Sequence, residues 1–351
     1  MSTSAATLRR EAIERAQAAA RAEYLQARAD TEARVLDLLD LLADDVSAYL
    51  VDLANPDGEL PADAQVLLEA YLSQRLQAFA AEWQAELGGL LEQAARIGAG
   101  IAAEGSAAVS IAQQAQLFLQ QFVAADGLQL SDRLWRLTTG TQADLVDLLR
   151  TTIAAGADAA RTADALLASS RSVPAELIAQ RNAARATSLG RAVRDALTEE
   201  GTANTRFNLI RLLRTEGNRA YTEAYVGSLA TVEGIAGVKF TLSPLHPRPD
   251  VCDLHAAANL HGMGRGVYPL NRHPYPAHPM TLSFLQPVFV DEITDEDRAG
   301  QQTAFEWIRT QPADLQDAVL GGQRKGTAFR AGELSPADLR TPWREIEGRS
   351  S

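Results

Sequence analysis

Apolar residues at helical spacing fill the first two thirds of this 351-residue chain, and they restrict it to a mainly helical fold. From about residue 8 to residue 51 they follow an i, i+3, i+4, i+7 rhythm, which is typical of an amphipathic helix. Alanine, leucine, glutamine, glutamate and arginine are abundant in this part, whereas aromatic residues make up only 6% of the whole chain. This composition favours long helices that pack through small side chains.

Glycine and proline divide the helical part into segments. Residues 55–58 (Asn-Pro-Asp-Gly) end the first helix, and Pro61 suits the first turn of a second helix that extends to about Gly98. Further helices are predicted at about 106–125, 131–155, 158–170, 175–199 and 203–233. These helices form either an autonomous bundle or a surface for partner helices, because an isolated helix needs a cover for its apolar stripe.

The sequence pattern changes after Gly234. Residues 237–242 alternate polar and apolar side chains and predict a strand, as do residues 284–290, where Pro287 indicates an edge strand. Short helices are predicted at about 304–310 and 312–320. We therefore expect a mainly α protein with a small α+β domain, divided into a helical arm or bundle (1–172), connecting helices (173–236) and a compact His/Cys/Pro-rich domain with short C-terminal helices (237–345).

The net charge restricts the binding partners of the chain, and the cysteine count bears on its cellular compartment. With 33 basic and 45 acidic residues the formal net charge is -12, which argues against a general binder of nucleic acid or of anionic membranes but allows a local basic patch. No window reaches the ~18 uncharged apolar residues of a membrane span, and the N-terminus lacks the apolar core of a signal peptide. One cysteine cannot form an intramolecular disulfide, which fits a reducing cytoplasm.

All five histidines and the only cysteine lie between residues 246 and 278. Cys252 and His255 are spaced as C-x2-H, and His273 and His278 as H-x4-H, so two local pairs could close a tetrahedral zinc site. The alternative is a metal-free loop in which the imidazoles cap turns and pack against prolines, which lower the entropy of the unfolded chain. Both interpretations remain open on sequence alone.

The predicted helix at 203–233 carries charged residues three or four positions apart, including Arg219 and Glu223. Such residues can form ion pairs along a helix surface. They are either a solvated charged face or an anchor that orders the proline-rich loop by bonding its free carbonyl groups.

A family resemblance rests on the residues of this C-terminal part. Residues 238–256 (VKFTLSPLHPRPDVCDLHA), then 266–269 (GVYP) and 276–279 (PAHP), resemble the domain of the Mu F-type phage head morphogenesis (minor capsid) proteins. The preceding helix resembles the Arg/Thr/Glu helix that enters this domain. The Trp-containing segment at 305–307 and the Leu-Gly turn at 320–321 resemble its tail. The resemblance covers roughly residues 205–340, and its motif positions include Arg214, Glu216, Arg219, Asp250, Tyr268 and Pro279.

The resemblance also bears on the metal. It implies a structural zinc ion held by Cys252, His255 and His278, with His273 as a replacement ligand. Many members continue with an Asn-Cys-Arg-Cys-like element, whereas Thr281 and Ser283 occupy those cysteine positions in this chain and are poor zinc ligands. We therefore expect no cofactor, and a structural zinc ion is the alternative.

The function that the resemblance implies is binding rather than catalysis. It implies a minor capsid or head morphogenesis protein of a tailed bacteriophage that acts at or near the portal, in the virion and, during assembly, in the host cytoplasm. The implied partners are the portal protein, capsid or scaffold subunits, and further copies of the chain through its helices. We expect no membrane contact and no sequence-specific binding of nucleic acid.

Two other classes of function compete with this one. A metal-assisted nuclease or toxin-like effector packaged in the virion would use Asp250, Asp253, His255 and His278 as acid/base or metal-binding groups. The chain carries no H-E-x-x-H, G-x-S-x-G or Walker motif, and its glycine-rich residues 262–266 precede Val-Tyr-Pro rather than a helix, which predicts a turn. A free cytosolic helical adaptor is the third class.

Overall fold

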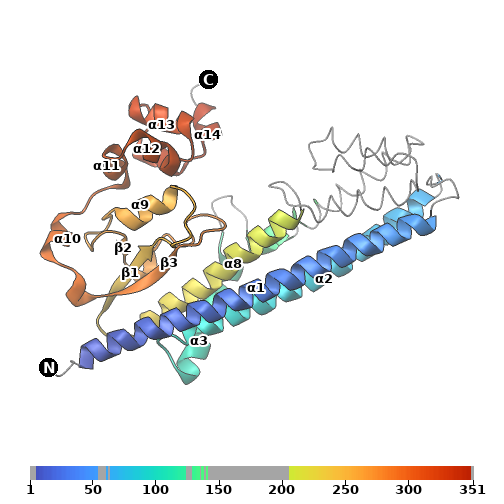
Figure 1. The fold of residues 1–351 in the computed structure, drawn as a ribbon, viewed down its shortest axis with the longest axis horizontal. Coiled ribbons are helices and arrows are strands. Elements are labelled where there is room, and N and C mark those ends of the chain that lie inside the picture. Colours follow the sequence, from blue (N-terminus) through green and yellow to red (C-terminus); the bar gives the residue numbers. More distant parts are fainter. Residues whose placement is uncertain are drawn as a thin grey trace. The chain divides into compact units, whose positions relative to one another are not determined.

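The computed structural model describes residues 5–53, 61, 64–123, 129–134, 136–137, 140 and 205–348 (Figure 1). These residues form long helices and a small antiparallel sheet of three strands, which confirms the predicted fold class. The helices predicted at 158–170 and 175–199, most of the one at 131–155, and the boundary near residue 172 lie outside the described residues. No described helix is long and apolar enough to cross a membrane.

The chain divides into two compact units, each drawing on distant parts of the sequence. One contains Met1–Tyr24, Ala94–Ala115 and Asn218–Ser351, and the other contains Leu25–Gln93 and Gln116–Gly217. Four helices contribute residues to both units: α1 (Ala5–Leu53), α2 (Ala64–Ala99), α3 (Gly105–Gln121) and α8 (Thr205–Leu229). These spans confirm the helices predicted at 8–51, 61–98, 106–125 and 203–233.

In the second unit, α1 and α2 pack against each other in antiparallel directions. In the predicted apolar stripe of α1, Leu39 and Leu42 are fully buried, and so is Leu72 of α2. Tyr49 and Tyr71 stack with ring centroids 3.9 Å apart, and Arg75 forms an ion pair of 2.6 Å with Asp45. The stripe on α1 is therefore covered by α2 of the same chain over this length.

The sheet belongs to the first unit and has the order β2-β1-β3, with both pairs antiparallel. The strands are β1 (Ile235–Thr241), β2 (Val267–Tyr268) and β3 (Phe284–Phe289). Among the described residues β3 has a strand partner on one side only, which confirms the edge position that Pro287 predicted. The long stretch between β1 and β3 contains α9 (Val251–Ala257), β2 and the short helix η1 (Leu270–Arg272).

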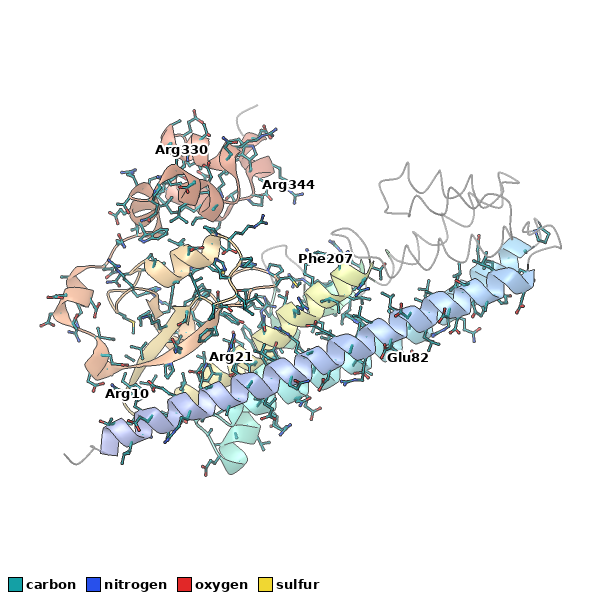
Figure 2. The ribbon with its side chains drawn as sticks, in the orientation of Figure 1. Arg10, Arg21, Glu82, Phe207, Arg330 and Arg344 are labelled. Carbon is teal, nitrogen blue, oxygen red and sulfur yellow. The ribbon has the colours of Figure 1, made fainter. Side chains whose placement is uncertain are left out.

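The first half of α1 lies along the free edge of β3. The side-chain amide of Gln17 donates a hydrogen bond of 3.1 Å to the Leu285 carbonyl oxygen, which points away from β1. Arg10 and Arg21 both belong to the first half of α1 (Figure 2). Their guanidinium groups lie over the rings of Phe289 and Phe284, 4.6 and 4.3 Å from the ring centroids. These contacts satisfy and shield an edge that could otherwise pair with another strand.

Short C-terminal helices form a second apolar cluster in the same unit, built around Trp307, Ile308 and Phe329 and joined by Leu254 of α9. The helices and their bounds are η2 (Val290–Glu292), α10 (Asp295–Ala299), α11 (Ala304–Arg309), α12 (Ala313–Leu320), α13 (Gln323–Arg330), η3 (Pro336–Arg340) and α14 (Trp343–Glu347). The predicted helices at 304–310 and 312–320 are confirmed. The resemblance to a Trp-containing tail thus falls on residues that build a core.

Helices α2 and α8 approach closely through small residues. Ala95, Ala99 and Ala224 are fully buried in one cluster, and a Cβ atom added to Gly98 would lie 2.3 Å from the Tyr221 carbonyl oxygen. Backbone atoms cannot move aside as the end of a long side chain can. Glycine is therefore required at position 98 by the packing of the two helices.

The substitution Gly98→Ala should lower the free energy of unfolding by roughly 1–3 kcal/mol, because the added methyl group forces α2 and α8 apart. Gly88 lies on the same helix with nothing within 4 Å of an added Cβ. Gly88→Ala should therefore raise stability by about 0.5–1 kcal/mol. Urea unfolding of both variants measures the contrast, and equal effects would show that the close approach does not exist.

Candidate functional site

Helix α9 positions the acidic and sulfur groups of the His/Cys/Pro-rich stretch. Asp250 caps its N-terminus, since Oδ1 of Asp250 accepts a hydrogen bond of 2.6 Å from the Cys252 N–H. Oδ2 of Asp253 accepts one of 2.8 Å from the Asp250 N–H, which completes a reciprocal cap. This reciprocal cap fixes the carboxylate of Asp250 beside the side chain of Cys252.

Three potential metal ligands meet at this point. A carboxylate oxygen of Asp250, Sγ of Cys252 and a ring nitrogen of His278 lie within 4.8 Å of one another. Nε2 of His278 is 3.2 Å from Oδ2 of Asp250, yet it is buried and has no hydrogen-bond partner, so the two atoms are close but not aligned for a hydrogen bond. Nδ1 of His278 lies 2.6 Å from the Pro279 carbonyl oxygen. Because a carbonyl only accepts, Nδ1 is the donor in this hydrogen bond, which leaves Nε2 as the ring atom that could bind a metal ion.

The thiol of Cys252 is buried beside two hydroxyl groups. Its Sγ lies 3.5 Å from Oγ1 of Thr281, and that oxygen also accepts a hydrogen bond from the Ser283 N–H. Burial raises the pKa of the Cys252 thiol to about 12. Without a cation nearby the thiol stays protonated at neutral pH, which makes it unreactive as a nucleophile.

The donor set is chemically suited to zinc. Zinc takes thiolate, imidazole and carboxylate ligands, and a ligating histidine commonly donates its other ring N–H to a carbonyl oxygen, as His278 does to Pro279. A bound cation would also lower the pKa of the buried thiol and satisfy the unbonded Nε2 atom. The residues therefore fit a three-ligand metal site.

A second group of potential ligands, His246, Asp250 and Asp253, shares Asp250 with the first. Nε2 of His246 lies 3.0 Å from Oδ2 of Asp253, the same oxygen that accepts the Asp250 N–H. Nε2 of His246 and Oδ2 of Asp253 therefore already have partners within the loop. The ring of His246 is thus held by Asp253, whose carboxylate also belongs to the cap of α9.

Of the four metal ligands expected from the sequence, Cys252 and His278 come together, whereas His255 and His273 do not join their cluster. Nδ1 of His255 lies 3.0 Å from the hydroxyl of Tyr268, which also donates a hydrogen bond to the His255 carbonyl oxygen. Nε2 of His273 lies 3.9 Å from a carboxylate oxygen of Glu223 on α8. The zinc set expected from spacing did not include Asp250, which was predicted as a metal-binding group only in the nuclease alternative.

The charged residues expected on α8 have different partners. In the second unit, Arg214 pairs with Glu32 at 2.7 Å and the buried Glu216 pairs with Arg133 at 3.0 Å. In the first unit, Arg219 lies near Glu223 and lowers its pKa, against the larger effect of burial. Loop anchoring comes from Asn218, whose amide donates a hydrogen bond of 3.3 Å to the Thr281 carbonyl oxygen.

Glu223 is a buried acid whose charge is disfavoured. Burial raises its pKa to about 7, whereas burial lowers the pKa of the neighbouring His273 to about 4. The folded protein therefore holds a proton on Glu223 that the unfolded chain releases above its ordinary pKa. By linkage, this residue makes stability fall as the pH rises from about 4.5 to 7.

The substitution Glu223→Gln should raise the free energy of unfolding at pH 8 by roughly 1–3 kcal/mol and change it little at pH 4.5, because glutamine resembles the protonated acid. Glu233→Gln, at an exposed position, is the matched control. Denaturant unfolding at the two pH values measures the difference. An equal effect of Glu223→Gln at both would contradict the raised pKa.

Comparisons of the chain with protein-family models, with curated proteins and with solved structures find no match.

Proposed function

We propose that this chain is a minor capsid or head morphogenesis protein of a tailed bacteriophage and that it acts by binding other head proteins. The sequence resemblance over residues 205–340 motivates this function. The observation that best supports this function is that the residues of the motif stabilise the local fold. Asp250 caps α9, Cys252 is buried as a thiol of high pKa, and Tyr268 bonds the backbone of α9.

A rigid loop is suited to recognition by shape. The side-chain amide of Asn218 holds the Thr281 carbonyl on one side and accepts a hydrogen bond of 2.8 Å from the Tyr24 hydroxyl on the other. The loop end is thereby fixed to α8 and to α1 within the first unit. A surface that is already ordered loses little conformational entropy on binding, which favours a binding role.

The helices supply further contact surface. Large apolar side chains stay exposed on them, among them Leu41 of α1 and Val66 and Leu67 of α2. In this proposal they meet the portal protein, capsid or scaffold subunits, or further copies of the chain. The protein would work at the portal vertex or head interior of the virion and in the host cytoplasm during assembly.

A structural zinc ion is part of the proposal, with Asp250, Cys252 and His278 as its ligands. Zinc would join the start of α9 to the end of the loop and hold the thiol as a thiolate. Its contribution would be stability of the loop, as in other small elements that lack a large core.

Protein grown with zinc should contain about one zinc ion per chain, and chelation should lower its melting temperature. Cys252→Ala and His278→Ala should each lose the metal. His261→Ala, in the same stretch but outside the cluster, should keep it. Metal analysis and thermal unfolding give the result, and metal-free protein, or variants that retain zinc, would contradict the site.

The competing function is a metal-assisted nuclease or a toxin-like effector carried in the virion, and the same cluster is the observation that favours it. Three ligands would leave a zinc ion open to a water molecule, which is the arrangement of catalytic zinc. Metal-dependent DNA cleavage that disappears in His278→Ala would support this alternative over the structural role.

The assembly function is tested by locating the chain in particles. Mass spectrometry of purified procapsids and virions should find it with the portal protein, at far fewer copies than the major capsid protein. Cross-linking should join its helices to portal or capsid subunits. Absence from both kinds of particle would contradict the proposal.

A further inference from the structure

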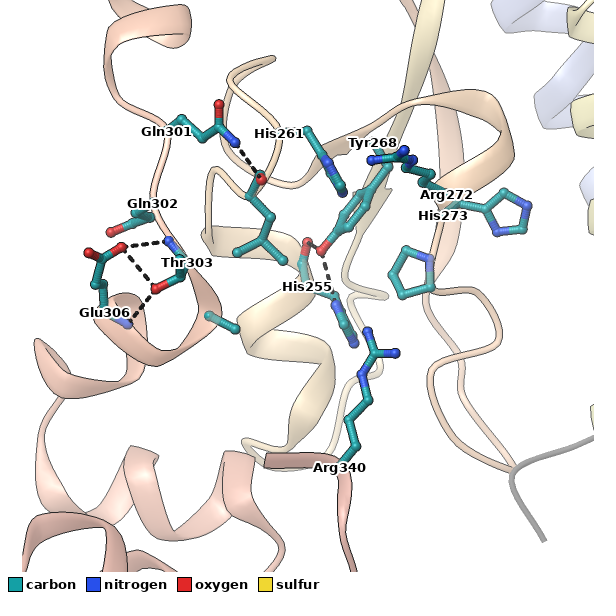
Figure 3. Close-up of a pocket in the computed structure, with 13 residues that line it drawn as sticks. His255, His261, Tyr268, Arg272, His273, Gln301, Gln302, Thr303, Glu306 and Arg340 are labelled. Atoms are coloured by element: carbon teal, nitrogen blue, oxygen red, sulfur yellow. Dashed lines mark hydrogen bonds between the residues drawn. The ribbon is translucent and has the colours of Figure 1, made fainter. Parts of the chain in front are cut away.

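A cavity of about 770 Å³ opens beside α9 in the first unit, separate from the Asp250, Cys252 and His278 cluster (Figure 3). Its walls come from α9, the end of β2, η1, the segment that leads into α11, and η3. The charged and ring-bearing residues that matter here are His255, His261, Tyr268, Arg272, Glu306 and Arg340. The size falls in the range of roughly 300–1,000 Å³ that is usual for small-molecule sites.

Two arginines give the cavity a positive charge. Arg272 on η1 and Arg340 on η3 both line it, and among the described residues neither guanidinium has a hydrogen bond or ion pair. The acid in the lining, Glu306, is exposed, as both arginines are, but it already accepts hydrogen bonds of 2.7 and 2.8 Å from the Thr303 N–H and hydroxyl. Two uncompensated arginines at one cavity are unexpected in a chain with 45 acidic and 33 basic residues.

Neutral hydrogen-bonding groups lie beside both arginines. Figure 3 shows Arg340 next to His255, whose pKa falls to about 4 through burial and then through this guanidinium. Burial, followed by Arg272, likewise lowers the pKa of His261. At neutral pH both rings can donate or accept hydrogen bonds, and a bound anion would favour their protonation.

We propose that this cavity binds a small phosphate ligand, either inorganic phosphate or an organic phosphate monoester. Planar guanidinium groups match phosphate oxygens with paired donors, and a phosphate monoester carries a charge of about -1.5 to -2 near pH 7, which balances two arginines. A phosphodiester within DNA offers one charge per phosphate. The net charge of -12 further disfavours DNA as the occupant.

The cavity has room for more than a phosphate ion, which favours an organic phosphate as its ligand. Leu260 and Pro274 supply apolar walls, and Gln301 and Gln302 supply amide groups. The ligand would contact η1 and η3, which are about seventy residues apart in sequence. Binding should therefore hold the segment at 336–340 against the part of the unit that contains the sheet.

Isothermal titration of the full chain with inorganic phosphate, adenosine monophosphate, adenosine and a short DNA duplex tests the proposal. Both phosphates should bind, and adenosine should not. Tighter binding of the monophosphate identifies an organic phosphate as the ligand, and equal binding identifies free phosphate. Hydrogen exchange of residues 336–340 should slow when phosphate is bound.

Arg272→Gln and Arg340→Gln should each weaken phosphate binding by at least about tenfold, as expected for loss of a charged hydrogen bond. Arg324→Gln, an exposed position on α13 that does not line the cavity, should leave binding unchanged. Thermal unfolding verifies that all three variants fold.

Failure of both phosphates to bind at millimolar concentration would overturn the proposal. So would equal binding by the two cavity variants and the wild type, equal binding of adenosine and its monophosphate, or stronger binding of the duplex. The proposal does not rest on the head-assembly function, because the titration needs no phage particle and neither result decides the other.

Discussion

The side-chain amide of Asn218 is the contact on which the His/Cys/Pro-rich loop depends. It is buried on α8, donates to the Thr281 carbonyl oxygen and accepts from the Tyr24 hydroxyl of α1. Tyr24 in turn stacks on Tyr221, one turn further along α8, with ring centroids 4.8 Å apart. Removing a buried amide of this kind leaves its partners unsatisfied, at a cost of about 1–3 kcal/mol for each.

Thr281 connects Asn218 to the candidate metal site. Its carbonyl is held by Asn218 while its hydroxyl contacts Sγ of Cys252, so one residue joins the helix anchor to the buried thiol. His278 lies three positions earlier on the same fixed segment and faces Asp250, the cap of α9. Metal binding, in this account, would strengthen a loop that hydrogen bonds already order. The cavity beside α9, where we propose that phosphate binds, is lined by other residues.

The periodicity of apolar residues was sufficient to predict the long helices and the two longer strands. It could not predict contacts between residues that are distant in the sequence. The apolar stripe at 35–50 predicted α1, and alternation predicted β1 and β3. Helix α9 was missed because its seven residues are too short for a period, although Asp250 and Asp253 carry a capping signature. Local spacing predicted that Cys252 and His255 bind a metal together. In the structure His255 contacts the hydroxyl of Tyr268, and the potential ligands near Cys252 are Asp250 and His278. Likewise, nothing in the helical pattern at 203–233 distinguishes Asn218 from its charged neighbours.

Hydrogen exchange of the loop in an Asn218→Ala variant tests most directly whether this amide holds the loop in place. The account predicts that backbone amides of residues 243–283 exchange at least about tenfold faster, while those of α11–α13 stay protected. Tyr24→Phe, which removes the hydrogen bond from the Tyr24 hydroxyl to Asn218, should have a smaller effect on the same residues. Unchanged exchange across 243–283 in Asn218→Ala would contradict the account.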